Sequence, residues 1–154
     1  MTINISNLQK SSEEIKEEMF SLMQELFPIC RSITGNGVRK TLERIKKDIP
    51  LSKFEIPTGT QVFDWIIPKE WNIVDAYVSD LSGKKIIDFQ KSNLHVVNYS
   101  IPIKKQISLN ELKKHIFSNP EKPNYIPYVT SYYNETWGFC LEHNELIKMK
   151  DKKY

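Results

Sequence analysis

The chain has 154 residues, of which 40% are hydrophobic and 27% charged, values that are ordinary for a soluble globular protein of one domain, or one small domain with a helical arm. The 22 basic and 19 acidic residues give a net charge of +3, and the lysine pairs are scattered, whereas nucleic-acid-binding proteins concentrate positive charge on one face. Two cysteines do not form a disulfide framework, no signal peptide opens the chain, and no apolar run approaches the ~20 residues that span a bilayer. We therefore expect no nucleic acid, no membrane and a cytoplasmic location.

The first third of the chain predicts two helices. Residues 11–14 have the form of a capping box, Ser-Ser-Glu-Glu. Apolar residues then recur at helical spacing up to Leu26, and Phe27-Pro28 should end the helix because the residue before proline leaves the helical region. After a loop of small polar residues at 30–37, whose glycines allow positive φ angles, a second helix is expected over residues 38–48. Together they predict a helical hairpin.

The next segments predict strands that form a β-meander. Residues 53–56, 61–67, 85–89 and 94–99 are short apolar stretches, and residues 70–78 alternate in polarity. The run from Ser79 to Gly83 is typical of a hairpin turn.

The last segments add one helix and two strand-like stretches. Ser108 and Glu111 suggest a second capping box, and the helix that it opens should include Ile116 and end before Asn119-Pro120. Residues 125–133 are aromatic and strand-like, and residues 138–141 are apolar. The predicted fold class is therefore α+β, an N-terminal helical hairpin followed by a small mixed β domain with one helix.

Few residues suggest metal or catalytic chemistry. His95 lies in a predicted strand and is expected to be a partly buried structural histidine, whereas His115 follows two lysines and is expected to be exposed. His143 lies near Cys140 and Glu142, but zinc needs three or four converging ligands. We predict no catalytic residue and no metal ligand in this chain.

Three other side chains have both a structural and a chemical interpretation. Cys30 beside Arg31 could be an activated thiol, but no histidine is near in the sequence to act as a base, so packing is the favoured interpretation. Asp64 and Asp75 are carboxylates among apolar neighbours, and we expect them to accept backbone hydrogen bonds at a sheet edge.

The aromatic residues leave two interpretations open. They either line a groove that stacks a sugar or a peptide, or fill the core of a small β domain. The residues concerned are Trp71, Tyr125, Tyr128, Tyr132, Tyr133 and Trp137.

Several stretches in the same order resemble a bacterial family of aminopeptidase-like proteins of unknown function. The resemblance covers residues 15–147. The stretches are LFPICRSITGNGVR at 26–39, VFDW at 62–65 with PKEW at 68–71, NLHVVNYS at 93–100, and IPYVTSYY at 126–133 with WGFC at 137–140.

The resemblance implies a protein about three times longer, with an α/β domain similar to co-catalytic zinc exopeptidases and a small β-rich domain inserted near its start. Residues 1–65 would be the first helices and entry strand of the peptidase-like domain, residues 66–147 the inserted domain, and residues 148–154 a tail. The zinc ligands of the family lie after the insert. The resemblance therefore implies zinc in the full-length protein, none in this chain, and a truncated chain that is inactive alone.

The resemblance also implies a substrate cleft. It would be bordered by the loop at 30–35 and by the Tyr132 and Trp137 region, and Arg31, Ser32, Tyr132 and Trp137 are the expected substrate contacts. Arg31 would pair with a substrate carboxylate in bidentate fashion. The substrate would be peptide-like or glycan-linked, and the family is associated with polysaccharide synthesis.

The apolar helix faces suggest a partner, because exposed apolar surface favours association. We expect either self-association or contact with the missing peptidase domain. The alternative function is a non-catalytic peptide- or glycan-binding module that uses the aromatic-rich β surface, and a third possibility is a structural interaction domain.

Overall fold

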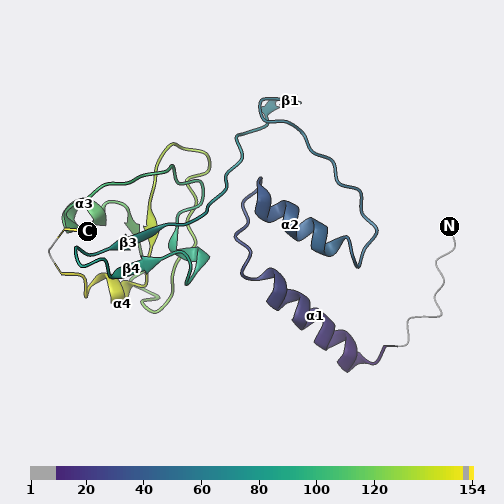
Figure 1. Ribbon diagram of the computed structural model, residues 1–154, viewed down its shortest axis with the longest axis horizontal. Helices are drawn as coiled ribbons and strands as arrows, with labels where there is room; N and C mark the ends of the chain where they lie inside the picture. The colour runs from purple at the N-terminus through teal and green to yellow at the C-terminus, as the bar shows by residue number, and fades with distance from the viewer. Residues whose placement is uncertain (1–9, 151–152) are drawn as a thin grey trace. The chain divides into compact units, whose positions relative to one another are not determined.

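The computed structural model describes residues 10–150 and 153–154 (Figure 1). The chain forms two compact units, Met1–Cys30 and Arg31–Tyr154. The opening residues, on which the expectation of no signal peptide rests, and part of the predicted tail lie outside the described residues. Among residues 10–150 and 153–154, no helix combines the length and apolar character needed to cross a bilayer.

The first unit contains helix α1 (Ser12–Leu26). Its capping box is confirmed: the backbone N–H of Ser11 donates to Glu14 Oε2 at 2.7 Å, and the N–H of Glu14 donates to Ser11 Oγ at 3.3 Å. The helix ends at Leu26, as Phe27-Pro28 predicts. None of its residues is buried, and Met19 and Met23 are among the apolar side chains that it exposes.

The second unit begins with helix α2 (Asn36–Ile45), which starts two residues earlier than predicted. Gly35 cannot cap the helix with a side chain. Instead, the side-chain oxygen of Asn72 accepts the Asn36 N–H at 2.7 Å, so a distant residue satisfies one of the free donors of the first turn. Because α1 and α2 belong to different units, their pairing as a hairpin stays a prediction.

Among the residues that the structure describes, the strands form three two-stranded sheets rather than the predicted meander. The pairs are β1 (Gln61–Val62) with β2 (Trp65–Ile66), β3 (Tyr77–Ser79) with β4 (Lys85–Asp88), both antiparallel, and β5 (Ile116–Phe117) with β6 (Phe139–Cys140), which is parallel.

Several predicted strands are therefore wrong. Residues 53–56 and 70–76 form no strand, and residues 94–99 contain a short 3₁₀ helix, η2 (Asn93–His95), and single bridges. Of residues 125–133, only Thr130 forms a bridge, with Asn98. Burial does not alternate along residues 70–78: Trp71, Ile73 and Ala76 pack against the core, while Val74 is 89% exposed. The backbone bends at Val74, and a strand also requires a pairing partner, which a polarity pattern does not reveal.

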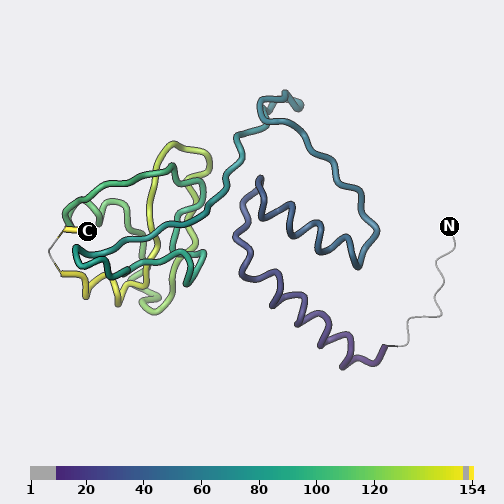
Figure 2. The backbone as a smooth tube through the Cα atoms, in the orientation of Figure 1, coloured from purple at the N-terminus to yellow at the C-terminus, as the bar shows by residue number. Residues whose placement is uncertain are grey.

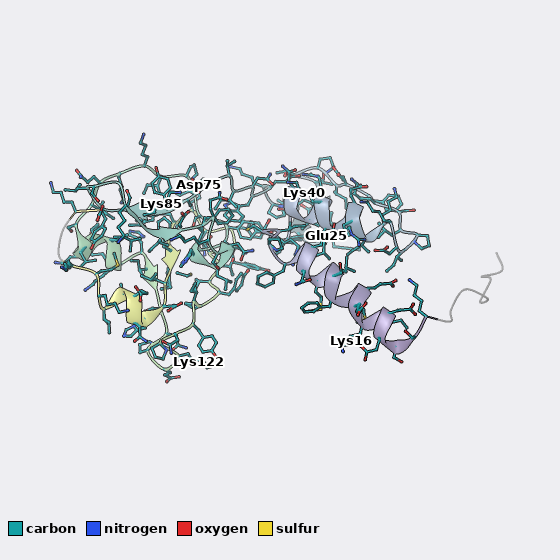
Figure 3. The ribbon with its side chains drawn as sticks, turned by 60° about the horizontal axis from the view of Figure 1, so that its bottom comes forward. Lys16, Glu25, Lys40, Asp75, Lys85 and Lys122 are labelled. Atoms are coloured by element: carbon teal, nitrogen blue, oxygen red, sulfur yellow. The ribbon has the colours of Figure 1, made fainter. Side chains whose placement is uncertain are left out.

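The hairpin between β3 and β4 is confirmed. Asp80 accepts hydrogen bonds from the N–H groups of Ser82 at 3.0 Å and Lys84 at 3.2 Å, and Gly83 has φ of +82°. Asp75, just before β3, and Lys85 of β4 form an ion pair at 3.7 Å, and Figure 3 shows the two residues close together. The carboxylate of Asp75 also accepts the N–H of Ala76 at 2.9 Å, so its observed role is structural.

Helix α3 (Leu109–Lys113) is shorter than predicted. Ser108 Oγ accepts the N–H of Glu111 at 3.3 Å, but the Glu111 carboxylate pairs with Lys114 at 2.8 Å. Ile116 belongs to β5 instead of the helix because its backbone pairs with Phe139. A fourth helix, α4 (His143–Leu146), was not predicted.

The core of the second unit lies between the β3–β4 hairpin, α3 and the β5–β6 pair, and Figure 1 shows these elements gathered together. The α+β fold class is confirmed. The buried core residues are Val78, Ile87, Val96, Leu109, Leu112, Ile116, Phe139, Leu141 and Tyr154.

Candidate functional site

The loop predicted to contact substrate is held by residues far away in the sequence. The N–H of Ile33 donates to the hydroxyl of Tyr99 at 3.0 Å, and that hydroxyl lies 3.2 Å from the hydroxyl of Tyr133. Ser32 Oγ lies 3.3 Å from the carbonyl oxygen of Trp71 and also bonds to the carbonyl of Thr34. The loop at 31–35 therefore joins a cluster of tyrosines, with Tyr99 as its anchor.

The tyrosine cluster has an unusual backbone. Tyr99, Tyr132 and Tyr133 have φ angles of 69°, 50° and 70°, a region that bulky residues rarely adopt. The rings of Tyr99 and Tyr133 lie 4.3 Å apart, and those of Tyr132 and Tyr133 lie 5.6 Å apart. Strain of this kind persists only where neighbouring structure enforces it, and it gathers at functional sites.

The three tyrosines differ in exposure. Tyr99 is buried and Tyr133 half-buried, while Tyr132 is 67% exposed. Burial raises the pKa of the Tyr133 hydroxyl, and the hydrogen bond with Tyr99 raises this pKa further. Of the cluster, Tyr132 is the residue available to a ligand.

Arg31 is exposed, and its Nη1 lies 3.5 Å from Thr41 Oγ1, a long hydrogen bond. A different arginine makes the bidentate carboxylate pair: Arg39 in α2 bonds to both oxygens of Glu70 and to Glu55 Oε1 at 3.1 Å. The hydrogen bonds from Arg39 lower the pKa of both carboxyl groups. No local sequence signal indicates this role, because Glu55 and Glu70 lie 16 and 31 residues from Arg39.

Trp137 lies in a different environment from Tyr132. Its ring stacks on His115 with 3.7 Å between centroids, and Lys105 Nζ lies 4.7 Å from its centroid. Together with Trp71 it lines an open groove of about 740 Å³. His115 is half-buried beneath this ring, so the prediction that it is exposed was wrong; the stacking partner is 22 residues away and not visible in the local pattern.

The aromatic residues divide between the two interpretations that the sequence left open. Trp71 and Trp137 pack against the core and line the groove. Tyr125, Tyr128 and Tyr132 are 69%, 64% and 67% exposed. Each of these exposed tyrosines offers stacking area for a ligand.

The donors present do not fit a zinc site. His95 Nδ1 lies 2.9 Å from the carbonyl of Cys140, and His143 Nδ1 lies 3.0 Å from Ser118 Oγ. Cys140 is fully buried, and burial raises the pKa of its thiol to about 11, which disfavours the thiolate that a metal requires. Within residues 10–150 and 153–154, no three His, Cys, Asp or Glu side chains gather as a metal site would require.

The anchor role of Tyr99 gives a prediction. Tyr99→Phe removes the acceptor for Ile33 N–H and the partner of Tyr133, and should lower the free energy of unfolding by about 1–3 kcal/mol. Tyr125→Phe changes an exposed side chain and should stay within about 0.5 kcal/mol. Urea unfolding followed by tryptophan fluorescence measures both. Equal effects in the two variants would show that the Tyr99 hydroxyl does not anchor the loop.

The chain matches a family model, a curated relative and a solved structure. A family model described as "Domain of unknown function (DUF2172)" matches residues 70–154, a little more than half of the chain. A protein of Clostridium acetobutylicum named "Putative polysaccharide biosynthesis protein with aminopeptidase-like domain" is 51% identical over 150 residues. That alignment covers 97% of this chain and 35% of the relative, so the chain spans about a third of the relative and matches its N-terminal part.

A solved structure agrees with this match. The crystal structure of a "putative peptidase" from Clostridium acetobutylicum superposes with a TM-score of 0.92 at 51% identity. The match covers 97% of this chain and 36% of that one. The chain therefore corresponds to the N-terminal part of a peptidase-like protein, as the resemblance implied.

Proposed function

Because the chain belongs to the DUF2172 family and matches the N-terminal third of an aminopeptidase-like relative, we propose that it is the N-terminal portion of a zinc aminopeptidase-like hydrolase. In this proposal the metal ligands lie in the remaining two thirds of the longer protein, and the chain alone is inactive. The observation that carries it is the 51% identity to a relative of which the chain spans only 35%.

The loop at 31–35 and the tyrosine cluster would form one border of the substrate cleft. Tyr132 is exposed, and Tyr99 holds the loop through the N–H of Ile33, which supports a role in positioning a peptide-like or glycan-linked substrate. Arg31 is exposed on the same loop and would meet a substrate carboxylate. Ser32 bonds to backbone oxygens, so it would act by shaping the loop, and Trp137 would act from the groove.

The domain boundaries and the cell context are part of the same proposal. Residues 1–65 would belong to the peptidase-like domain, residues 66–147 to the inserted β-rich domain and residues 148–154 to a tail. The exposed apolar side chains of α1, such as Met19 at 61% and Met23 at 64%, would be covered by the peptidase-like domain or by a second copy. A role in polysaccharide synthesis is suggested by the name of the relative, and a cytoplasmic location is the remaining part of the proposal.

The zinc content of the purified chain tests this proposal. After exhaustive dialysis without chelator, elemental analysis should find far less than one zinc per chain, because no three His, Cys, Asp or Glu side chains gather within residues 10–150 and 153–154 and a zinc site needs three or four converging ligands. Stoichiometric zinc would contradict the proposal. In that case His143→Ala and His115→Ala would show which histidine binds it.

The second candidate is a non-catalytic peptide- or glycan-binding module. The three exposed tyrosines favour it, since aromatic surfaces stack on sugar rings and peptide side chains. It differs from the first candidate in one respect: the isolated chain itself would bind a peptide or glycan, and Tyr132→Ala would abolish that binding while the protein stays folded.

A further inference from the structure

One side of the groove beside Trp137 is a segment whose backbone N–H and C=O groups do not pair with other described backbone groups. The groove is lined by β3 on one side and by the segment 100–105 on the other, with Trp137 and Phe139 also in its lining. Within the part of the chain that the structure describes, residues 102–106 make no backbone hydrogen bond. Strand β3 pairs with β4 alone among these residues. Unpaired strand edges are templates for an added strand.

A strand ladder already begins at one end of this groove. The N–H of Ile107 donates to the carbonyl of Tyr154 and the N–H of Tyr154 donates to the carbonyl of Ile107, each at 2.9 Å. The neighbouring pair Ser108 and Lys153 forms an antiparallel bridge. Figure 2 shows this end of the chain beside the green segment that leads to α3. Tyr154 itself is buried and belongs to the groove lining.

The register of this ladder defines which groups would pair next. In an antiparallel ladder, residues that exchange both hydrogen bonds recur at every second position. Ile107 and Tyr154 are such a pair. The backbone N–H and C=O groups of Lys105, and then those of Ile103, are therefore the next ones that would pair with a strand continuing from Tyr154. The N–H of Ile101 already donates to the carbonyl of Thr136 at 2.9 Å, and this bond closes the edge at its far end.

We propose that this groove is the docking site for a short strand, contributed by the polypeptide that follows the matched part in the longer relatives. The strand would run antiparallel to residues 103–107 and pair with Lys105 and Ile103. Two observations identify the segment that would occupy the groove. A chain that continued beyond Tyr154 in the same ladder would run beside residues 103–105, which line the groove. The C. acetobutylicum relative has about two thirds of its length beyond the match. The inference rests on the family membership and not on hydrolase activity.

The lining of the groove indicates the side chains that would fit. Val96, Leu112 and Phe139 belong both to the core and to the groove lining. Since side chains alternate across a strand, every second residue of the docked strand would be apolar and would extend this core, while the residues between would face away from it.

An extended form of the chain tests the proposal. The eight residues that follow the position of Tyr154 in the C. acetobutylicum relative are appended to Tyr154, and a Gly-Ser extension of equal length serves as the control. Amide hydrogen exchange measured by NMR should become at least about tenfold slower at Ile103 and Lys105 in the first protein than in the control. Ile87 and Leu112, which are buried already, report whether both proteins are folded.

A matched pair of variants tests the register. Proline at the second appended residue removes the donor that faces Lys105 and should reduce the protection at least about threefold, whereas proline at the third appended residue should reduce it less. Equal exchange in the relative-derived and Gly-Ser extensions would overturn the proposal. So would protection at Lys104 and Gln106 instead of Ile103 and Lys105. Zinc in the purified chain would leave this result unaffected, so the two proposals fail separately.

Discussion

Gly35→Ala should lower the free energy of unfolding of the Arg31–Tyr154 unit by about 3–4 kcal/mol, because it combines backbone strain with a clash. Gly35 has φ of +119°, and a Cβ atom there would lie 2.6 Å from the carbonyl oxygen of Trp71 and 2.9 Å from Asn72 Oδ1. The carbonyl is backbone and cannot rotate away. The Asn72 oxygen also accepts the Asn36 N–H that starts α2, so relieving the clash would break this cap.

Gly83→Ala is the matched control. Gly83 has φ of +82°, but a Cβ atom there would meet nothing within 4 Å, so only the strain of the left-handed region remains, about 1–2 kcal/mol. Urea unfolding monitored by tryptophan fluorescence compares the two variants. If Gly35→Ala costs no more than Gly83→Ala, the contact between the loop and Trp71 is not a determinant of stability, and the anchoring of the candidate site is overturned with it.

These two glycines show that a local sequence pattern predicts a turn but not the contacts that distant residues make with it. Both lie in stretches that read as turns, and the positive φ angle was predicted for the loop at 30–37. The larger expected loss of stability at Gly35 comes from the backbone carbonyl of Trp71 and the side chain of Asn72. These residues lie 36 and 37 positions further along the chain. The capping box at Ser11 was predicted fully because its two partners are three residues apart.

The same distinction applies to the candidate site. The resemblance implied that the loop at 30–35 and the Tyr132 and Trp137 region border a cleft, and the structure joins Ile33 of this loop to Tyr133 through Tyr99. Tyr99 itself was treated as one residue of a strand, and no local signal indicates that its hydroxyl reaches Ile33, 66 residues away. The role of Arg31, Ser32, Tyr132 and Trp137 as substrate contacts stays a prediction.

The wrong strands have a common physical cause. Trp71, Ile73 and Ala76 pack against the core, but they do not share one face of a period-two pattern, because the backbone bends at Val74. Burial of a side chain does not require a ladder, and these three side chains pack against the core although residues 70–76 form no strand. Ile116 is the reverse case, since helical spacing placed it in a helix but pairing with Phe139 places it in β5.

Leu112→Ala should destabilise the second unit by about 2–5 kcal/mol, the range for a leucine removed from a packed core. Leu112 is 2% exposed and lies in α3, where it belongs to the same cluster as Ile87 and Phe139. Its loss leaves a cavity at the point where α3 meets the strands. Because the buried core cluster that the structure describes lies between Val78 and Tyr154, the effect should appear in the part of the chain that matches the family model.

Leu81→Ala is the control, since Leu81 is 66% exposed in the β3–β4 turn and should change stability by less than about 0.5 kcal/mol. Thermal and urea unfolding of both variants, followed by the fluorescence of Trp71 and Trp137 at the edge of the core, give the comparison. A loss below about 1 kcal/mol for Leu112→Ala would mean that the core of the isolated chain is loosely packed. It would also indicate that the rest of the longer protein contributes to the stability of this unit. The strand proposed for the groove would be the first segment to test for that role, because Leu112 belongs to the groove lining.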